Sequence, residues 1–154
     1  MRKLVVFNNV TLDGYFTDRN GDMSWAHKDD PEWNAFAADN AKGGGTLLFG
    51  RITYEMMASW WPTPQAMKSM PAVAERMNNL PKVVFSRTLD KASWNNTKLV
   101  KEDIAAEVRR MKKEPGGGMA IMGSGTIKKL NLKQQTKTRT FGNGNVLLCY
   151  EPTA

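Results

Sequence analysis

Two short stretches of the chain join the end of an apolar run to glycine and then to a predicted helix. The first runs over 47–55 with its glycine at Gly50, and the second runs over 119–126 with glycines at Gly123 and Gly125. A buried strand that delivers glycine to a helix N-terminus leaves backbone N–H groups unpaired, and the helix dipole adds positive potential at the same place. Two such turns in one small domain therefore predict a ligand with more than one phosphate, such as a dinucleotide.

Turns of this kind need strands and helices in alternation, and the sequence predicts both. A further strand pair, 136–141 and 146–150, flanks Gly142-Asn143-Gly144-Asn145 and predicts a hairpin with an antiparallel edge. Short apolar strands between helices indicate an α/β fold with a sheet that is covered on both faces. The other predicted strands are 3–11, 46–49, 82–85, 98–100 and 119–122. One predicted helix begins at Pro31 and stops near 43–45, and the others are 51–60, 72–78 and 102–113.

The bulk composition is that of one soluble globular domain over residues 1–154. Hydrophobic residues make up 41% of the chain and charged residues 24%, which is ordinary for a globular protein. No apolar run approaches the roughly 18 residues of a membrane span, and Asn8 and Asn9 interrupt the first one too early for a secretory signal. A single cysteine, Cys149, excludes a disulfide framework and a cysteine metal site. We expect a cytoplasmic protein with no metal and no membrane partner.

The net charge of +7 is concentrated in one part of the chain. Residues 98–139 carry 11 basic and 4 acidic side chains, whereas residues 1–97 carry 11 basic and 10 acidic ones. A basic region is usually a solvated surface, and it also suits a site for a polyanionic cofactor. No helix-turn-helix, zinc-finger or RNA-binding signature accompanies these charges, so nucleic acid is not an expected partner.

Four motifs follow one another along nearly the whole chain. They are Thr11-Leu12-Asp13-Gly14-Tyr15, Phe49-Gly50-Arg51-x-Thr53-Tyr54-Glu55, Val83-Val84-Phe85-Ser86-Arg87 and Met122-Gly123-Ser124-Gly125-Thr126. Together they resemble the dihydrofolate reductase-like superfamily, and within it the C-terminal reductase domain of the bifunctional riboflavin-biosynthesis deaminase–reductase. The resemblance implies a three-layer α/β fold, with a mostly parallel central sheet, helices on both faces and an antiparallel C-terminal hairpin.

The resemblance also implies a function. The expected activity is that of an NADPH-dependent reductase similar to 5-amino-6-(5-phosphoribosylamino)uracil reductase, which transfers hydride from NADPH to a small heterocycle-linked substrate. A pterin reductase similar to dihydrofolate reductase is one alternative, and a degenerate member that binds a nucleotide without turnover is another. Related folds often pair, so a homodimer is the expected assembly.

Cofactor contacts carried over from the resemblance lie along an NADPH molecule extended across the sheet. Gly50, Arg51 and Thr53 would meet phosphates at one helix start. Ser86 and Arg87 would lie near the adenosine 2′-phosphate, to which a guanidinium can make two parallel hydrogen bonds. The pyrophosphate and nicotinamide ribose would be approached by Gly123, Ser124, Gly125 and Thr126, and the nicotinamide by Asn9 and Phe16.

Plain structural alternatives exist for several of these residues. Gly50 could simply end its strand, and Arg87 could be a surface arginine that pairs with Asp90. Asp13-Gly14 is better explained as a tight turn than as a catalytic site. These alternatives stay open at the level of sequence.

A catalytic acid is harder to place than the cofactor contacts. The cofactor carries out hydride transfer, so the protein mainly positions donor and acceptor and supplies a proton. Folate-reducing relatives use a carboxylate on the first helix, and Asp30 falls at the matching distance from Trp25. A carboxylate there could polarise a substrate. The alternative, which the sequence favours, is that Asp30 is only the N-cap of a helix with Pro31 in its first position.

One departure from the family pattern concerns the region after Ile127. Relatives continue the helix there and add a strand and a long loop before the terminal hairpin, whereas this chain passes directly to Lys128-Lys129-Leu130. A helix and a strand with their loops, roughly 30 residues at typical element lengths, are therefore expected to be absent between about 127 and 128. Three explanations would produce this pattern: a deletion, an arrangement swapped with a partner chain, or consecutive numbering across a segment that is left out.

Overall fold

The computed structural model describes residues 1–26, 30–42, 44–123 and 132–152, and it divides the chain into two compact units. The sheet unit comprises residues 1–8 and 38–124, and the hairpin unit comprises residues 9–37 and 125–154. Positions 127 and 128 lie outside the described residues. The single domain over 1–154 and the absent segment therefore stay predictions.

The sheet unit is built on a parallel sheet of five strands in the order β1-β5-β2-β3-β4. Central strands of a parallel sheet are covered on both faces and are therefore continuously apolar. For this reason the sequence predicted the strands that begin at Thr46 and Lys82. The strands are β1 (Leu4–Phe7), β2 (Thr46–Gly50), β3 (Lys82–Phe85), β4 (Thr97–Val100) and β5 (Met119–Met122).

The first strand is shorter than the prediction of 3–11. It ends at Phe7, and a hydrogen-bonded turn occupies the following segment. Within that turn the Gly14 amide donates to the Thr11 carbonyl at 2.9 Å, and the Thr11 amide donates to the Tyr15 carbonyl at 2.9 Å. Gly14 has a φ of +88°, which suits glycine. The interpretation of Asp13-Gly14 as a tight turn is therefore confirmed, and the long first strand is wrong.

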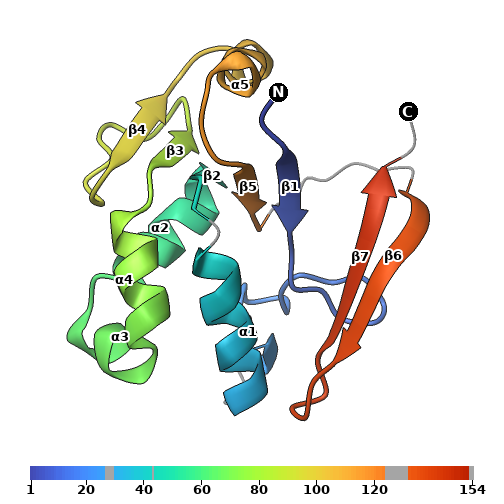
Figure 1. Ribbon diagram of the computed structural model, residues 1–154. Helices are drawn as coiled ribbons and strands as arrows, with labels where there is room; N and C mark the ends of the chain where they lie inside the picture. Colours follow the sequence, from blue (N-terminus) through green and yellow to red (C-terminus); the bar gives the residue numbers. More distant parts are fainter. Residues whose placement is uncertain (27–29, 43, 124–131, 153–154) are drawn as a thin grey trace. The chain divides into compact units, whose positions relative to one another are not determined.

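Helices of the sheet unit follow the predicted order with one addition. They are α2 (Arg51–Trp60), α3 (Pro64–Ser69), α4 (Pro71–Asn79) and α5 (Ile104–Lys113), and the boundary between the two units falls within α1 (Pro31–Lys42). Helix α3 was not predicted from the sequence, and it lies against α4 (Figure 1). Its start is nevertheless encoded locally, because the Thr63 side chain accepts a hydrogen bond from the Ala66 amide and proline occupies the first turn.

Helices cover both faces of the sheet, as predicted. On one face Leu48 and Val83 form a buried cluster with Met111 of α5. On the other face Phe49, adjacent to Leu48 in β2 and therefore pointing the opposite way, stacks edge-on against Tyr54 of α2 with ring centroids 6.4 Å apart. The alternation of side chains along β2 thus anchors α5 to one face and α2 to the other.

The hairpin unit contains the antiparallel strands β6 (Leu132–Thr140) and β7 (Val146–Pro152), which lie side by side in Figure 1. It also holds the short helix η1 (Ser24–Ala26) and the first residues of α1. The Gly144 amide donates to the Phe141 carbonyl at 3.0 Å across the turn, and Gly144 has a φ of +86°. The predicted hairpin is confirmed, and both strands extend further than expected.

Among the helices that the structure describes, none combines the length and the apolar character needed to span a bilayer.

Candidate functional site

The carboxyl ends of β2, β3 and β5 lie together at one edge of the sheet, here called the carboxyl edge. Gly50 is in register with Phe85 of β3, and Leu48 is in register with Ile121 of β5. Because all three strands run parallel, their last residues lie at the same edge, where open α/β sheets bind their ligands. The structure therefore brings together the described residues of three of the four motifs, and Gly123 is the last described residue of the motif that follows β5.

Gly50 is the N-cap of α2, and its environment leaves room for a ligand. It has an ordinary φ of −78°, and no side chain caps the helix at this position. By contrast, α5 is capped by the Asp103 carboxylate, which accepts hydrogen bonds from the Ala105 and Ala106 amides at 2.9 and 3.0 Å. A Cβ atom built on Gly50 would meet no atom within 4 Å. The fold itself does not require glycine here, so the residue suits close approach of an anion to the first turn of α2.

Gly123, after β5, is held in place by the first turn of α2. Its carbonyl accepts a hydrogen bond of 3.0 Å from Thr53 Oγ1, and its amide donates to the Phe7 carbonyl at 2.9 Å. It has a φ of +56°, and a Cβ atom there would lie 3.2 Å from Thr53 Cγ2. This glycine is required by backbone conformation and by close packing, unlike Gly50.

The turn after β3 is shaped by the Ser86 hydroxyl and is joined to α2 by Arg51. Ser86 Oγ accepts hydrogen bonds from the Thr88 and Leu89 amides at 3.2 and 3.0 Å. Arg51 Nη1 donates to Thr88 Oγ1 at 2.7 Å, while its Nε donates to Glu55 at 2.9 Å. Thr88 was not singled out by the sequence analysis, although it directly follows the Ser86-Arg87 pair that was.

Arg87 lies on the same turn and is exposed. Together with Arg51, the first residue of α2, it places two guanidinium groups at the carboxyl edge. Arginine is suited to planar, bidentate contacts with phosphate. The edge thus combines an uncapped helix start with nearby positive charge, which is the chemistry that a phosphorylated ligand needs.

Comparison with known protein families fixes the membership of the chain. Residues 2–140 match the family described as the RibD C-terminal domain. The chain belongs to this family. RibD C-terminal domains are reductase domains of the dihydrofolate reductase-like superfamily, and NADPH binding is typical of them. The family membership confirms the resemblance derived from the four motifs.

A curated relative is the uncharacterized protein YyaP of Bacillus subtilis (strain 168). It is 25% identical over 126 residues, which make up 82% of this chain and 65% of the relative. The chain thus spans less than two thirds of the length of the relative that it matches. This similarity adds no defined activity.

The remaining predicted cofactor contacts of this RibD C-terminal domain lie outside the described part of the sheet unit. Asn9 and Phe16 belong to the hairpin unit and are each half-buried. Ser124, Gly125 and Thr126 lie outside the described residues. For all of them the assigned roles stay predictions. Within the described ranges, no group of three or more histidine, cysteine, aspartate or glutamate residues is arranged to hold a metal ion.

Asp30 caps α1 in the way that the sequence favours. Its Oδ1 accepts a hydrogen bond of 2.6 Å from the Trp33 amide, and its carbonyl accepts one of 2.9 Å from the Asn34 amide. The other carboxylate oxygen lies close to the hairpin turn, since a Cβ atom built on Gly142 would be 3.0 Å from Oδ2. The N-cap interpretation is confirmed, and the catalytic role of Asp30 stays a prediction.

Aromatic packing ties the start of α1 to the hairpin within the hairpin unit. The Trp33 and Phe141 rings meet edge-on with centroids 5.0 Å apart, and Phe36 lies 5.2 Å from Phe141. The Arg139 guanidinium stacks 4.9 Å from the Phe141 ring and pairs with Glu32 at 2.8 Å. These contacts hold Asp30 beside the hairpin turn.

Proposed function

We propose that the protein is an NADPH-dependent reductase of the riboflavin-biosynthesis type, which transfers hydride to a small heterocycle-linked substrate. The observation that carries the proposal is the meeting of the carboxyl ends of β2, β3 and β5 at one edge, beside a helix start whose N-cap glycine offers no side chain. Family membership supports it, because RibD C-terminal domains are reductases that typically use NADPH.

The residues of the carboxyl edge fit the phosphates of such a cofactor. Backbone amides in the first turn of α2, at Arg51 to Thr53, would bind a phosphate next to Gly50, where a side chain would stand in the way. Arg87 would bind the adenosine 2′-phosphate, with Ser86 shaping the turn that carries it. Bound NADPH would supply the hydride, and the protein would supply position and charge.

Arg87 is the residue on which cofactor selectivity depends in this proposal. Arg51 already engages Glu55 and Thr88, so Arg87 is the exposed arginine of the turn that can turn toward a ligand. Since NADH lacks the 2′-phosphate, Arg87 should favour NADPH and contribute little to NADH binding.

Nucleotide titrations followed by tryptophan fluorescence test this proposal. Wild-type protein should bind NADPH more tightly than NADH, and Arg87→Ala should weaken NADPH binding about tenfold, as expected for the loss of one charge-assisted contact. NADH binding should be unchanged. Arg109→Ala, at an exposed arginine of α5, is the matched control. If neither nucleotide binds, the proposal is wrong.

A second candidate function is nucleotide binding without turnover. It is favoured by the use of the Asp30 carboxylate as a helix cap, which leaves the carboxylate that the resemblance suggested as proton donor engaged in a structural role. Cofactor oxidation assays with a pyrimidine ribosylamine and with a dihydropterin separate the possibilities. NADPH oxidation in the presence of the ribosylamine supports the first proposal, and NADPH oxidation in the presence of the dihydropterin supports a dihydrofolate reductase-like activity. Tight NADPH binding without oxidation in the presence of either substrate supports the second candidate.

We also propose that the protein acts as a cytoplasmic homodimer, since related folds often pair. Light scattering should then give twice the 17.2 kDa of one chain. A mass of one chain across the working concentration range would contradict it.

A further inference from the structure

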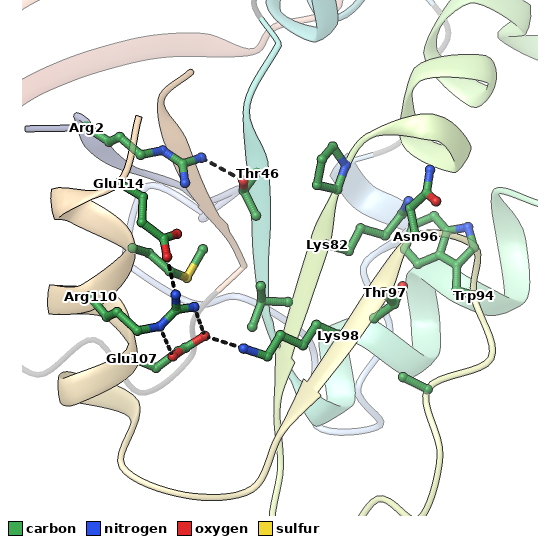
Figure 2. Close-up of a pocket in the computed structure, with 14 residues that line it drawn as sticks. Arg2, Thr46, Lys82, Trp94, Asn96, Thr97, Lys98, Glu107, Arg110 and Glu114 are labelled. Atoms are coloured by element: carbon green, nitrogen blue, oxygen red, sulfur yellow. Dashed lines mark hydrogen bonds and ion pairs between the residues drawn. The ribbon is translucent and has the colours of Figure 1, made fainter. Parts of the chain in front are cut away.

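The sheet unit has a hollow at the edge opposite the proposed cofactor site. It is open, has a volume of about 630 Å³ and lies where β2, β3 and β4 begin (Figure 2). Thr46, Lys82 and Thr97, the first residues of these three strands, all line it. The volume falls within the range of small-molecule sites. Because the carboxyl edge lies at the other end of the same strands, this amino-edge hollow is a separate place.

The inner wall of the hollow consists of buried side chains, and the hydrogen-bond donors of Lys82 are used within the protein. Trp94 and Met111 are buried there, and Lys82 is 1% exposed. The Lys82 ammonium donates to the carbonyls of Asn78, Leu80 and Asn95 at 3.1, 2.7 and 2.9 Å. Since an ammonium has three N–H donors, Lys82 has none left for a ligand. Its positive charge nevertheless lies in the wall.

The rim of the hollow carries the groups that a ligand would meet. Arg2, Lys98 and Arg110 line it together with Glu107 and Glu114. With Lys82 in the wall, four cationic side chains thus face two carboxylates in the described lining, so the hollow has a positive surplus. A concave site with a surplus of one sign of charge concentrates ligands of the opposite sign.

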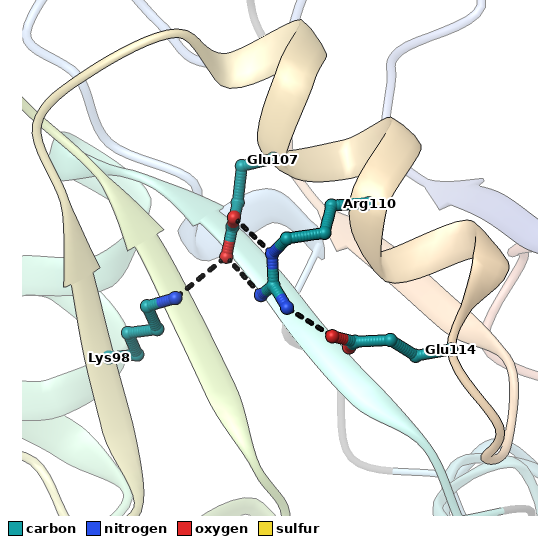
Figure 3. Close-up of polar contacts among 4 residues, drawn as sticks. All are labelled: Lys98, Glu107, Arg110 and Glu114. Atoms are coloured by element: carbon teal, nitrogen blue, oxygen red, sulfur yellow. Dashed lines mark hydrogen bonds and ion pairs between the residues drawn. The ribbon is translucent and has the colours of Figure 1, made fainter.

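Glu107 is the fixed carboxylate of the rim. It accepts hydrogen bonds from Lys98 at 2.8 Å and from two nitrogens of Arg110 at 2.8 Å each (Figure 3). These contacts lower the pKa of Glu107 to about 2, with the Arg110 hydrogen bond as the largest cause. Its side chain is only 13% exposed. Glu107 therefore holds Arg110 and Lys98 in place at the rim.

Glu114 is the replaceable carboxylate. It follows the last turn of α5, its side chain is 43% exposed, and it pairs with Arg110 through Nη1. Because Glu107 engages the other side of the guanidinium, Arg110 keeps its position when Glu114 moves away. Arg2 stands at the same rim, fixed by hydrogen bonds to the Gly117 carbonyl at 2.6 Å and to Thr46 Oγ1 at 2.7 Å.

We propose that the amino-edge hollow binds a small ligand with two or more negative charges, and that this ligand replaces Glu114 on Arg110. Arg110, Lys98 and Arg2 supply the positive charge, and Glu114 serves as an internal counter-ion in the absence of the ligand. Phosphoryl and carboxylate groups share this chemistry, since both accept hydrogen bonds from guanidinium and ammonium groups. The site does not depend on the proposed reductase activity.

Calorimetric titration of the full chain with pyrophosphate, and separately with citrate, tests the proposal. Arg110→Gln should weaken binding about tenfold or more, whereas Glu114→Gln should tighten it several-fold because the competing carboxylate is gone. Arg109→Gln and Glu102→Gln make the same charge changes on exposed residues outside the lining, and they should have little effect. Lys98→Gln is a second weakening variant should Arg110→Gln fail to fold. The tighter of the two probes identifies the preferred anionic group.

Three results would overturn the proposal. Equal effects of the paired variants, Arg110→Gln with Arg109→Gln and Glu114→Gln with Glu102→Gln, would indicate attraction to a basic surface with no defined site. Loss of binding in Arg87→Ala but not in Arg110→Gln would place the probe at the carboxyl edge. Absence of binding by wild-type protein at low salt would also contradict it.

Discussion

Thr53 Oγ1 donates a hydrogen bond of 3.0 Å to the carbonyl of Gly123. This bond joins the first turn of α2 to the end of β5, two segments separated by 70 positions in the sequence. It holds the start of α2 next to Gly123 at the carboxyl edge, so it matters for stability and for the proposed cofactor site alike.

The first prediction concerns this bond. Thr53→Val keeps the shape of the side chain but removes the donor, so we expect a loss of about 1 kcal/mol in the free energy of unfolding. Thr53→Ser keeps the hydroxyl and should lose less. Urea unfolding measures both. If the two variants are equally stable, the hydrogen bond does not contribute as described.

The two glycines of the carboxyl edge should respond differently to alanine. Gly123→Ala should lower stability by about 1–2 kcal/mol, because φ is +56° and the added Cβ would lie 3.2 Å from Thr53 Cγ2. Gly50 has an ordinary φ and open surroundings. In Gly50→Ala the reduced freedom of the unfolded chain offsets the weaker N-cap preference of alanine, so stability should change by no more than about 0.5 kcal/mol.

Gly50→Ala should nevertheless weaken NADPH binding, since the methyl group enters the space assigned to a phosphate. Thermal unfolding and nucleotide titration of the same protein samples separate the two effects. A Gly50→Ala protein that is stable and binds NADPH as tightly as wild type would remove the helix start of α2 from the proposed site.

Asp30 can be tested for a role beyond capping. Asn caps helices about as well as Asp, so Asp30→Asn should keep its stability, whereas Asp30→Ala should lose about 1 kcal/mol. If the carboxylate supplies or relays a proton, both variants lose turnover. Full turnover in Asp30→Asn would mean that capping is its whole role.

Lys82 should make stability depend on alkaline pH. Burial lowers the pKa of Lys82 from 10.5 to about 8. Between these values the unfolded chain holds a proton that the folded protein has released, so the free energy of unfolding should rise as pH increases from about 8 to 10.5, by at most about 3 kcal/mol.

Urea unfolding of wild type and Lys82→Met at several alkaline pH values checks this. The difference between the two proteins isolates Lys82 from the other titrating groups. Lys82→Met should be less stable at every pH, because three carbonyls lose their donor, and it should lack this rise. A parallel pH dependence in the two proteins would contradict the assignment.

Glu107 should contribute to acid sensitivity. Its pKa is lowered to about 2 by hydrogen bonds with Arg110 and Lys98, so its stabilising contribution is complete above pH 4.5 and is lost as pH falls towards 2. We expect about 1 kcal/mol, because the partners are exposed to solvent. Glu107→Gln should be less stable at pH 7 and should show a smaller loss between pH 4.5 and 2. Urea unfolding at several pH values measures this. An equal loss of stability between pH 4.5 and 2 in wild type and Glu107→Gln would contradict the prediction.

Elements with strong local signals could be predicted from the sequence. The helix over 51–60 and the strand over 82–85 have the predicted bounds, because apolar runs, prolines and glycines specify them locally. The first strand was predicted too long and α3 was missed, since turn hydrogen bonds and a short capped helix produce little periodicity. Trp94 was also missed as a core residue, although it is 5% exposed, because its burial depends on Tyr54 and Phe49 from distant segments.

The sequence by itself determined the family, the parallel α/β plan and the glycine turns that follow the strands. Only the tertiary structure distinguished Gly50, which the fold leaves open, from Gly123, which the fold requires. It also revealed the link from Arg51 to Thr88 and the rim formed by Arg2, Lys98 and Arg110. The physical reason is that local patterns encode strands, caps and turns, whereas strand order and register decide which loops share an edge and which charges face one another.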